Sequence, residues 1–263
     1  MKVKNIFEEE VFYSTVRVAI NTSQGASIGT GFIAEIYLGD KNNNKLTLLI
    51  SNKHVFHDPA NHIFLNFHKL DPDDGGPLLG EFVSIEQQDF SHVYWSHPNP
   101  NIDLACINIS SLTHRNDIHF KNIPTSMFAT FDEDDLIPGA SIWFVGYPEN
   151  RFDVINNLPL LRRGYISSVP RFDFNGEKQF IVDAQVYPGS SGSPCFAFVN
   201  GSYKLLGIVT ATMIKHEMLQ SLPSNSNLGI HQTLGLGIVL KTTLLEELFS
   251  LVRNDTVQKY NLS

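Results

Sequence analysis

Hydrophobic residues recur at every second position in short bursts along the chain. The clearest bursts are Val16, Val18 and Ile20; Leu46, Leu48 and Ile50; Ile63, Leu65 and Phe67; and Ile142 and Phe144. A period of two is typical of strands that bury one face. The bursts are separated by clusters of turn-forming residues at 39–44, 71–77 and 174–176, which suit connections between antiparallel strands. The pattern predicts an all-β protein built as a sandwich or a pair of barrels.

Two segments depart from this pattern. Near the end of the chain, helical spacing relates Leu244, Leu245, Leu248, Leu251 and Val252. We expect a helix there, with Thr243 and Glu246 forming a capping box at its start. The stretch 122–139 interrupts the strand pattern, so we predict a linker there between an N-terminal unit, 1–121, and a C-terminal unit, 140–263.

Composition restricts the partners of this 263-residue chain. It carries 27 acidic and 19 basic residues, a formal charge of -8, which argues against nucleic acid as a partner. No segment approaches the ~18 uninterrupted apolar residues of a membrane helix, so we expect no membrane span. The first ten residues lack the apolar stretch of a signal peptide, and Cys106 and Cys195 are too few for a disulfide framework. We therefore expect a cytoplasmic protein.

Three separate segments carry groups suited to nucleophilic catalysis. Ser191 lies between glycines in the run 189–194, where the backbone can turn tightly and approach a substrate carbonyl. A serine hydroxyl needs an imidazole as base and a carboxylate that orients the imidazole. His54 follows an apolar strand, and Asp103 precedes another. Taken singly, these residues could equally be a turn serine, one of ten histidines, and a strand-end cap.

Taken in the order His54, Asp103, Ser191, the three segments resemble the catalytic strands of chymotrypsin-like serine peptidases. Five more segments resemble the bacterial high-temperature-requirement branch of that family: 29–33, 163–168, 183–188, 206–209 and 235–239. The resemblance spans about residues 12 to 252. It implies two antiparallel β-barrels with the active site between them, of which the first carries His54 and Asp103 and the second carries Ser191. A C-terminal helix would complete the fold, and the source would be bacterial.

The resemblance also assigns roles to these residues. Ser191 would be the nucleophile, His54 the general base and then acid, and Asp103 the group that orients His54. The oxyanion hole would be the backbone of Gly189, Ser190 and Ser191, with the amides of Gly189 and Ser191 as donors. The implied reaction is hydrolysis of peptide bonds in a protein or peptide substrate, through an acyl-serine intermediate and without a cofactor.

Specificity and control are harder to predict. By analogy with the family, the substrate pocket would be lined by Gln185, Val186, Thr210, Ala211, Thr212 and Gly237. None of these is charged, so we hypothesise a preference for uncharged, small or medium apolar residues before the scissile bond. Ser190 stands where zymogen-activated members have an aspartate, which argues against activation by a new N-terminus. Only about ten residues follow the expected helix, so we expect no appended peptide-binding domain, and we expect control by a protein partner or by disorder of 187–190.

Other functions remain open at this stage. His54, His57, His62 and His68 could bind a metal, but their spacing matches no closed site, and we expect none. The acidic run 132–135 could bind calcium, but it lacks the glycine and spacing of a calcium loop, so a solvated linker is the preferred interpretation. The fold could serve as a catalytically silent binding or scaffold module. The same acyl-serine chemistry would also cleave esters.

Overall fold

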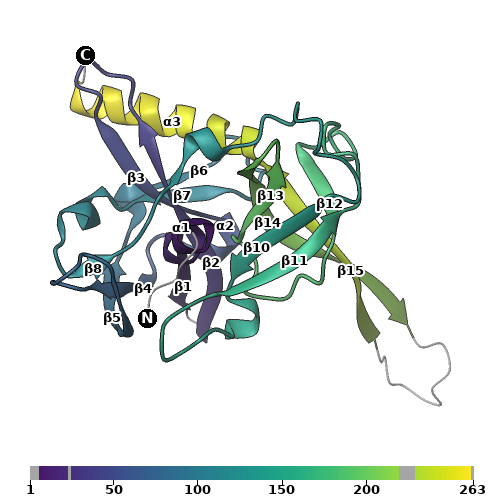
Figure 1. Ribbon diagram of the computed structural model, residues 1–263, viewed down its shortest axis with the longest axis horizontal. Helices are drawn as coiled ribbons and strands as arrows, with labels where there is room; N and C mark the ends of the chain where they lie inside the picture. The colour runs from purple at the N-terminus through teal and green to yellow at the C-terminus, as the bar shows by residue number, and fades with distance from the viewer. Residues whose placement is uncertain (1–5, 23–24, 219–228, 262–263) are drawn as a thin grey trace.

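Two β units lie side by side, with one helix between them and another that begins beside the second unit and extends along the first (Figure 1). The computed structural model describes residues 6–22, 25–218 and 229–261. The helices are α1 (Ile6–Ser14), α2 (Lys53–Phe56) and α3 (Thr242–Tyr260), with short 3-10 turns η1 (Ser91–Val93), η2 (Ser110–His114), η3 (Thr125–Met127) and η4 (Pro148–Asn150). The all-β fold class predicted from the sequence is confirmed, because strands form both units.

The first unit is a nine-stranded sheet in the order β5-β4-β1-β2-β3-β7-β6, with β8 paired to β4 and β9 to β2. Its strands are β1 (Thr15–Thr22), β2 (Gly25–Tyr37), β3 (Lys45–Ser51), β4 (His62–Leu70), β5 (Pro77–Gln88), β6 (Tyr94–Ser96), β7 (Ala105–Asn108), β8 (Ile118–His119) and β9 (Ile123–Pro124). The alternating bursts fall within β1, β3 and β4 as predicted, and their apolar side chains are buried. This continuous sheet stands in the place of the first predicted barrel.

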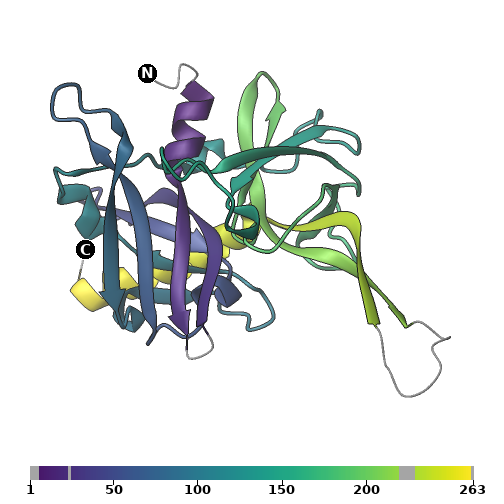
Figure 2. The same ribbon diagram turned by 90° about the horizontal axis from the view of Figure 1, so that it is seen from below.

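The second unit is a closed barrel in the order β10-β11-β12-β15-β14-β13. Its strands are β10 (Ser141–Gly146), β11 (Leu160–Ile166), β12 (Gln179–Asp183), β13 (Pro194–Val199), β14 (Ser202–Met218) and β15 (Gly229–Lys241). The far ends of β14 and β15 pair with each other beyond the barrel and project from the body of the molecule (Figures 1 and 2). Only the near ends of these two long strands close the barrel, through β13 and β12.

Helices α1 and α3 close the junction between the units. One core cluster joins Leu245 and Leu248 of α3 to Phe32 of the sheet and to Phe196 of the barrel. Phe7 of α1 packs edge-on against the Phe196 ring in the same cluster. Helix α1 was not predicted from the sequence. Burial of Phe7 against the barrel explains why this segment is helical.

The predicted C-terminal helix is confirmed, but its predicted cap is wrong. The residue that precedes α3 is Lys241, and no side chain caps the helix. The hydroxyl of Thr242 instead donates to the Ala129 carbonyl at 2.8 Å, which ties the start of α3 to the segment between the units. The Lys241 ammonium is buried and pairs with Asp173 at 2.7 Å. The packing of this end against the barrel therefore replaces a local cap.

The division into 1–121, 122–139 and 140–263 stays a prediction. β9 pairs in parallel with β2, so the strand pairing of the first unit extends into the predicted linker.

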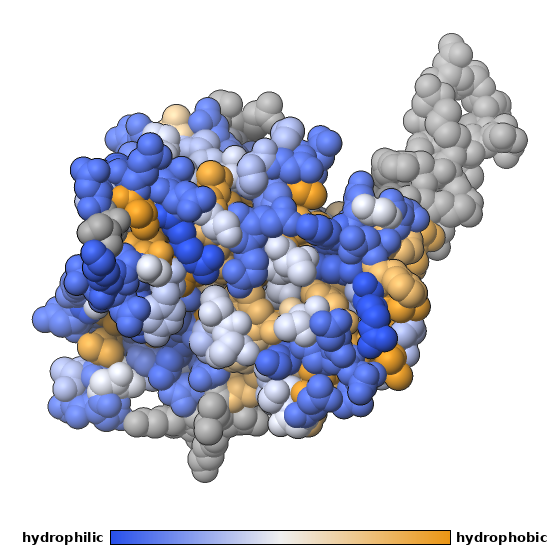
Figure 3. All heavy atoms as spheres, turned by 90° about the horizontal axis from the view of Figure 1, so that it is seen from above, coloured by the Kyte–Doolittle hydropathy of each residue, from blue (hydrophilic) through white to orange (hydrophobic). Residues whose placement is uncertain are grey.

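The face of the molecule in Figure 3 is mostly hydrophilic, with separate hydrophobic patches. Within the described residues, every helix is too short or too polar to pass through a lipid bilayer.

Candidate active site

His54 and Asp103 meet because β3 pairs with β7. The register places Ser51 opposite Ala105, so the residues that follow β3 lie beside those that precede β7. His54 Nδ1 lies 2.5 Å from Asp103 Oδ2, and the His54 amide donates to Asp103 Oδ1 at 3.1 Å. The His54 side chain is 52% exposed, which leaves the ring open to solvent on its other side. A carboxylate that fixes an imidazole in this way also fixes its tautomer, as a general base requires.

Two further residues hold Asp103 in place. Asn52 is fully buried, and its Nδ2 donates to the Asp103 carbonyl at 2.6 Å and to Thr210 Oγ1 at 3.2 Å. The Thr210 hydroxyl donates in turn to Asp103 Oδ2 at 3.1 Å. The sequence analysis missed Asn52 and gave Thr210 only a pocket role. The contacts of Asn52 are with residues far away in the chain, so the sequence held no local signal for its role.

These contacts set the protonation of the acid. Burial raises the pKa of the Asp103 carboxyl, but hydrogen bonds from the His54 ring, the His54 amide and the Thr210 hydroxyl outweigh it. The net pKa lies below its ordinary value, so the carboxylate is charged near neutral pH. Asp103 can therefore stabilise an imidazolium on His54 when that ring takes a proton.

Ser191 reaches the same place from the barrel. Its Oγ donates to the Thr210 carbonyl at 3.2 Å. Thr210 thus contacts Ser191 through its carbonyl and Asp103 through its hydroxyl, which brings two of the predicted catalytic residues together on one residue of β14. No hydrogen bond joins the described side chains of Ser191 and His54. Attack by Ser191 would require its hydroxyl to turn from Thr210 toward the imidazole, a contact that often forms only with substrate bound.

The segment before Ser191 is a tight turn that positions backbone amides. Ser190 N donates to the Tyr187 carbonyl at 3.0 Å, with Pro188 second in the turn and Gly189 third at a φ of +86°. This is the form of a type II turn, which needs glycine at its third position. The turn is hydrogen-bonded in this conformation, and control by disorder of 187–190 stays a prediction.

The turn also decides which amides are free. The amides of Gly189 and Ser191 donate to no other residue that the structure describes, and both are available to an incoming oxyanion. Ser190 is different, because its amide is already bonded to Tyr187. The predicted donors are the other two amides, and the assignment of the Gly189, Ser190 and Ser191 backbone to an oxyanion hole stays a prediction.

Two of the predicted pocket residues, Gln185 and Val186, lie between β12 and this turn, and the other four lie in β14 and β15. Gln185 and Ala211 are exposed, whereas the Val186 side chain packs within the barrel core. A Cβ at Gly237 would come 2.6 Å from the Val186 side chain, so a small residue is needed there. The Thr212 hydroxyl donates across to the Leu236 carbonyl at 3.2 Å. The assignment of these residues to a substrate pocket stays a prediction.

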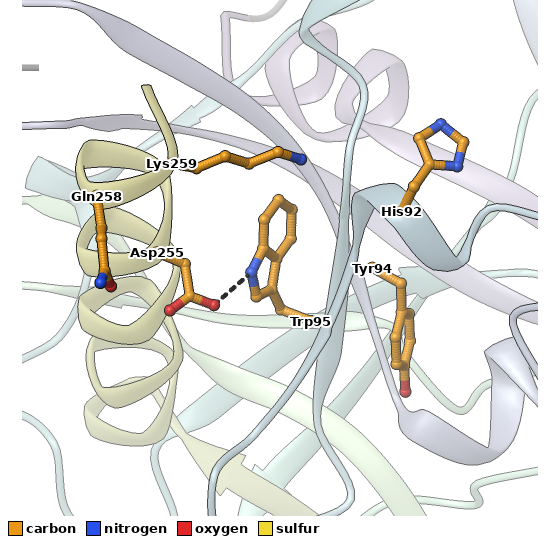
Figure 4. A pocket seen from close by; sticks show the side chains of 6 residues that line it. All are labelled: His92, Tyr94, Trp95, Asp255, Gln258 and Lys259. Carbon is orange, nitrogen blue, oxygen red and sulfur yellow. Dashed lines mark hydrogen bonds between the residues drawn. The ribbon is translucent and has the colours of Figure 1, made fainter. Parts of the chain in front are cut away.

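A separate depression of about 340 Å³ lies between β6 and α3. Its lining residues are His92, Tyr94, Trp95, Asp255, Gln258 and Lys259, and Trp95 Nε1 donates to Asp255 at 3.0 Å (Figure 4). It contains none of the predicted catalytic residues.

The histidines considered as a metal site form no such site in the part of the chain that the structure describes. Residues 6–22, 25–218 and 229–261 contain no group of three or more His, Cys, Asp or Glu that could hold a metal ion. His68 instead bonds the Asn156 carbonyl at 2.9 Å.

A family model described as a trypsin-like peptidase domain matches residues 29–208, a range that includes His54, Asp103 and Ser191. The chain belongs to the trypsin-like peptidase family. The class predicted from the sequence, a serine endopeptidase of trypsin-like fold, is thereby confirmed at the level of the family. No curated protein matches the chain in sequence.

Solved structures agree on the fold of this trypsin-like domain. A serine endoprotease from Yersinia pestis has a TM-score of 0.54 at 16% identity, with 97% of this chain and 69% of that chain covered. The HtrA-type protease AlgW, solved with a tripeptide, has a TM-score of 0.53 at 19% identity, with 94% of this chain covered. The present chain spans 62% of that AlgW chain. A scabies mite inactivated protease paralogue has a TM-score of 0.50 at 14% identity, with 94% of this chain and 96% of that chain covered. These likenesses establish a chymotrypsin-like two-barrel fold.

Proposed function

We propose that this trypsin-like domain hydrolyses peptide bonds through an acyl-enzyme on Ser191. The observation that carries the proposal is the 2.5 Å contact between His54 Nδ1 and Asp103 Oδ2, with Ser191 and Asp103 both bonded to Thr210. A carboxylate, an imidazole and a hydroxyl in one place are the groups that acyl transfer needs.

In the proposed reaction, the Ser191 hydroxyl turns to His54 Nε2 and loses its proton to that nitrogen as its oxygen attacks the scissile carbonyl. The carbonyl electron pair moves onto oxygen, and the amides of Gly189 and Ser191 donate to this oxyanion. The intermediate collapses when the carbon–nitrogen bond breaks, and the imidazolium gives its proton to the leaving amine. Water then repeats the sequence on the ester, releasing the acid and the free serine.

Asp103 supports both halves of this cycle without exchanging a proton. Its contact with Nδ1 keeps the proton of neutral His54 on that atom, so Nε2 is free to act as the base. Its negative charge then stabilises the imidazolium. Asn52 and Thr210 keep the carboxylate in position through the bonds described above.

A catalytically silent binding module is the second candidate function. The observation that favours it is the Ser191 hydroxyl, which donates to the Thr210 carbonyl and not to the His54 ring. A relative of the same fold has been described as an inactivated protease paralogue, which shows that this fold occurs without activity. The two candidates differ in whether Ser191 reacts.

Cleavage of a peptide library, followed by mass spectrometry, tests the proposal. We expect the wild type to cut peptides, and Ser191→Ala to lose on the order of 10⁶ in kcat. Ser193→Ala serves as the matched control, because Ser193 lies two positions on but is buried. Its activity should stay close to wild type. Absence of cleavage by folded wild-type protein over the whole library would favour the binding module.

The same library addresses specificity. We propose that the residue before the scissile bond is uncharged and small or medium in size, since all six predicted pocket residues are uncharged. A dominant preference for Arg or Lys would contradict this. Control by a protein partner and a cytoplasmic location stay predictions.

A further inference from the structure

Thr30 in β2 of the first unit contacts the active-site segments of the second unit on several sides. Its hydroxyl donates to the Gly189 carbonyl at 2.7 Å and accepts from the Tyr147 amide at 3.1 Å. Its own amide donates to the Ser191 carbonyl at 3.0 Å, and its carbonyl accepts from the Ser51 hydroxyl at 2.6 Å. Thr30 is fully buried. Every polar atom of this residue is therefore bonded, and three of the four bonds cross to the barrel.

The bond to Gly189 acts on the turn that offers the oxyanion donors. The peptide between Pro188 and Gly189 is the central peptide of the type II turn, and its orientation sets the direction of the Gly189 N–H. A flip of this peptide converts the turn to type I and points that N–H away. The Glu149 amide holds the Pro188 carbonyl at 2.6 Å, while Thr30 holds the Gly189 carbonyl. Both peptide planes around Gly189 are fixed from outside the turn.

Close packing leaves Thr30 little freedom to move. A Cβ at Gly192 would come 1.8 Å from the Thr30 carbonyl oxygen, and a Cβ at Gly146 would come 2.6 Å from the Thr30 hydroxyl. The two glycines let the backbone of the second unit approach Thr30 directly. A hydroxyl confined in this way has a fixed direction, so it can restrain the carbonyl that it bonds.

We propose that Thr30 is a positioning residue: by holding the Gly189 carbonyl it fixes the Gly189–Ser190 peptide of the turn, and so keeps the adjoining Gly189 amide, whose own peptide is held by Glu149, directed toward the oxyanion. The inference rests on the proposed peptidase function and deepens it. Thr30 contacts no reacting atom in this scheme and acts only through the turn. Its loss should therefore weaken binding of a tetrahedral, negatively charged oxygen more than binding of an uncharged peptide.

The chain offers matched variants. Thr30→Val keeps the shape and removes the hydroxyl, while Thr30→Ser keeps the hydroxyl. Thr242→Val is the control for loss of a buried threonine hydroxyl, because Thr242 is buried and donates to the Ala129 carbonyl at a similar 2.8 Å. If Thr30→Val does not fold, Thr30→Ala also lacks the hydroxyl and takes up less space.

The experiment compares a peptide boronic acid, which forms a tetrahedral adduct with the active-site serine, with the carboxamide of the same peptide. The peptide is a good substrate sequence from the library. We expect Thr30→Val to lower kcat by roughly 10- to 100-fold with little change in KM, and to weaken boronate inhibition by a similar factor. Carboxamide inhibition should change by less than about threefold. Thr30→Ser should recover most of the loss, and Thr242→Val should show none.

The possible outcomes distinguish failure of the role proposed for Thr30 from failure of the proposed peptidase function. Equal weakening of boronate and carboxamide inhibition by Thr30→Val would show a merely structural role and overturn the inference. Unchanged kcat and boronate inhibition in a folded variant without the hydroxyl would also overturn it, while leaving the peptidase proposal intact. A folded wild type that neither cleaves peptides nor binds the boronate would overturn the proposed function and, with it, this inference.

Discussion

The sheet unit and the barrel contribute to the candidate site in different ways. The sheet unit provides side chains: His54, Asp103, Asn52 and Thr30 act through an imidazole, a carboxylate, an amide and a hydroxyl. Apart from the Ser191 hydroxyl and the side chain of Thr210, the barrel provides backbone, in a turn shaped by Gly189 and in the Thr210 carbonyl. The two units should therefore respond differently to substitution. Side-chain changes in the sheet unit should affect rates, and backbone changes in the barrel should affect folding.

The largest effect is expected for Asp103→Asn in the sheet unit. The amide no longer stabilises the imidazolium and no longer selects the tautomer, so kcat should fall by on the order of 10⁴. The melting temperature should change little, since the Thr210 hydroxyl can still bond the new side chain. Asp58→Asn is the control, because the Asp58 carboxylate is exposed and accepts the Ala60 amide. A loss of rate that merely followed the loss of folded protein would contradict the division between the units.

Gly192→Ala should show the opposite pattern. Its φ is +89°, and the new Cβ would lie 1.8 Å from the Thr30 carbonyl oxygen. We expect a loss of roughly 3 kcal/mol or more in the free energy of unfolding, measured by urea denaturation. Gly176→Ala separates strain from collision, because Gly176 has a φ of +80° and open space around it. It should lose only about 1–2 kcal/mol. Equal losses of unfolding free energy in the two variants would show that a Cβ at position 192 does not collide with the Thr30 carbonyl oxygen.

A third effect is pH-dependent and involves His68, which bonds Asn156 across the units. Burial lowers the pKa of His68 to about 4. The unfolded chain takes up the proton below its ordinary pKa of 6.5, while the folded chain does not until about pH 4. The free energy of unfolding should therefore fall as the pH falls through this window, by at most about 3 kcal/mol from His68.

His68→Gln should flatten that decline, as measured by denaturation between pH 7 and pH 4. Some decline should remain, since burial also lowers the pKa of nearby His119. The exposed His114 offers a control, and His114→Gln should leave the pH dependence unchanged. An equally steep decline in His68→Gln would contradict the role given to His68.

The smallest effect is expected at the surface of the sheet unit. Lys69 and Glu81 form an ion pair at 2.7 Å between β4 and β5, and both side chains are about half exposed. Solvent screens such a pair, so Lys69→Ala should change the free energy of unfolding by less than about 0.5 kcal/mol. A larger loss, removed by high salt, would show that surface charge contributes more to this unit than we assume.

Local patterns predicted the parts of the site that depend on short segments. His54 and Asp103 could be found because each lies at the end of an apolar burst, and Ser191 because it lies between glycines. The roles of Thr30 and Asn52 could not be found in this way, since each depends on contacts with residues far away in the chain. Helix α1 was missed for the same reason, because its Phe7 packs against Phe196 of the other unit.

Whether Ser191 is an activated nucleophile can be tested by treating the folded protein with a fluorophosphonate and mapping the adduct by mass spectrometry. We expect one adduct, on Ser191, that forms in the wild type and is lost or greatly slowed in His54→Ala. No adduct on folded wild-type protein, or an adduct on Ser191 that forms equally fast without His54, would contradict this expectation.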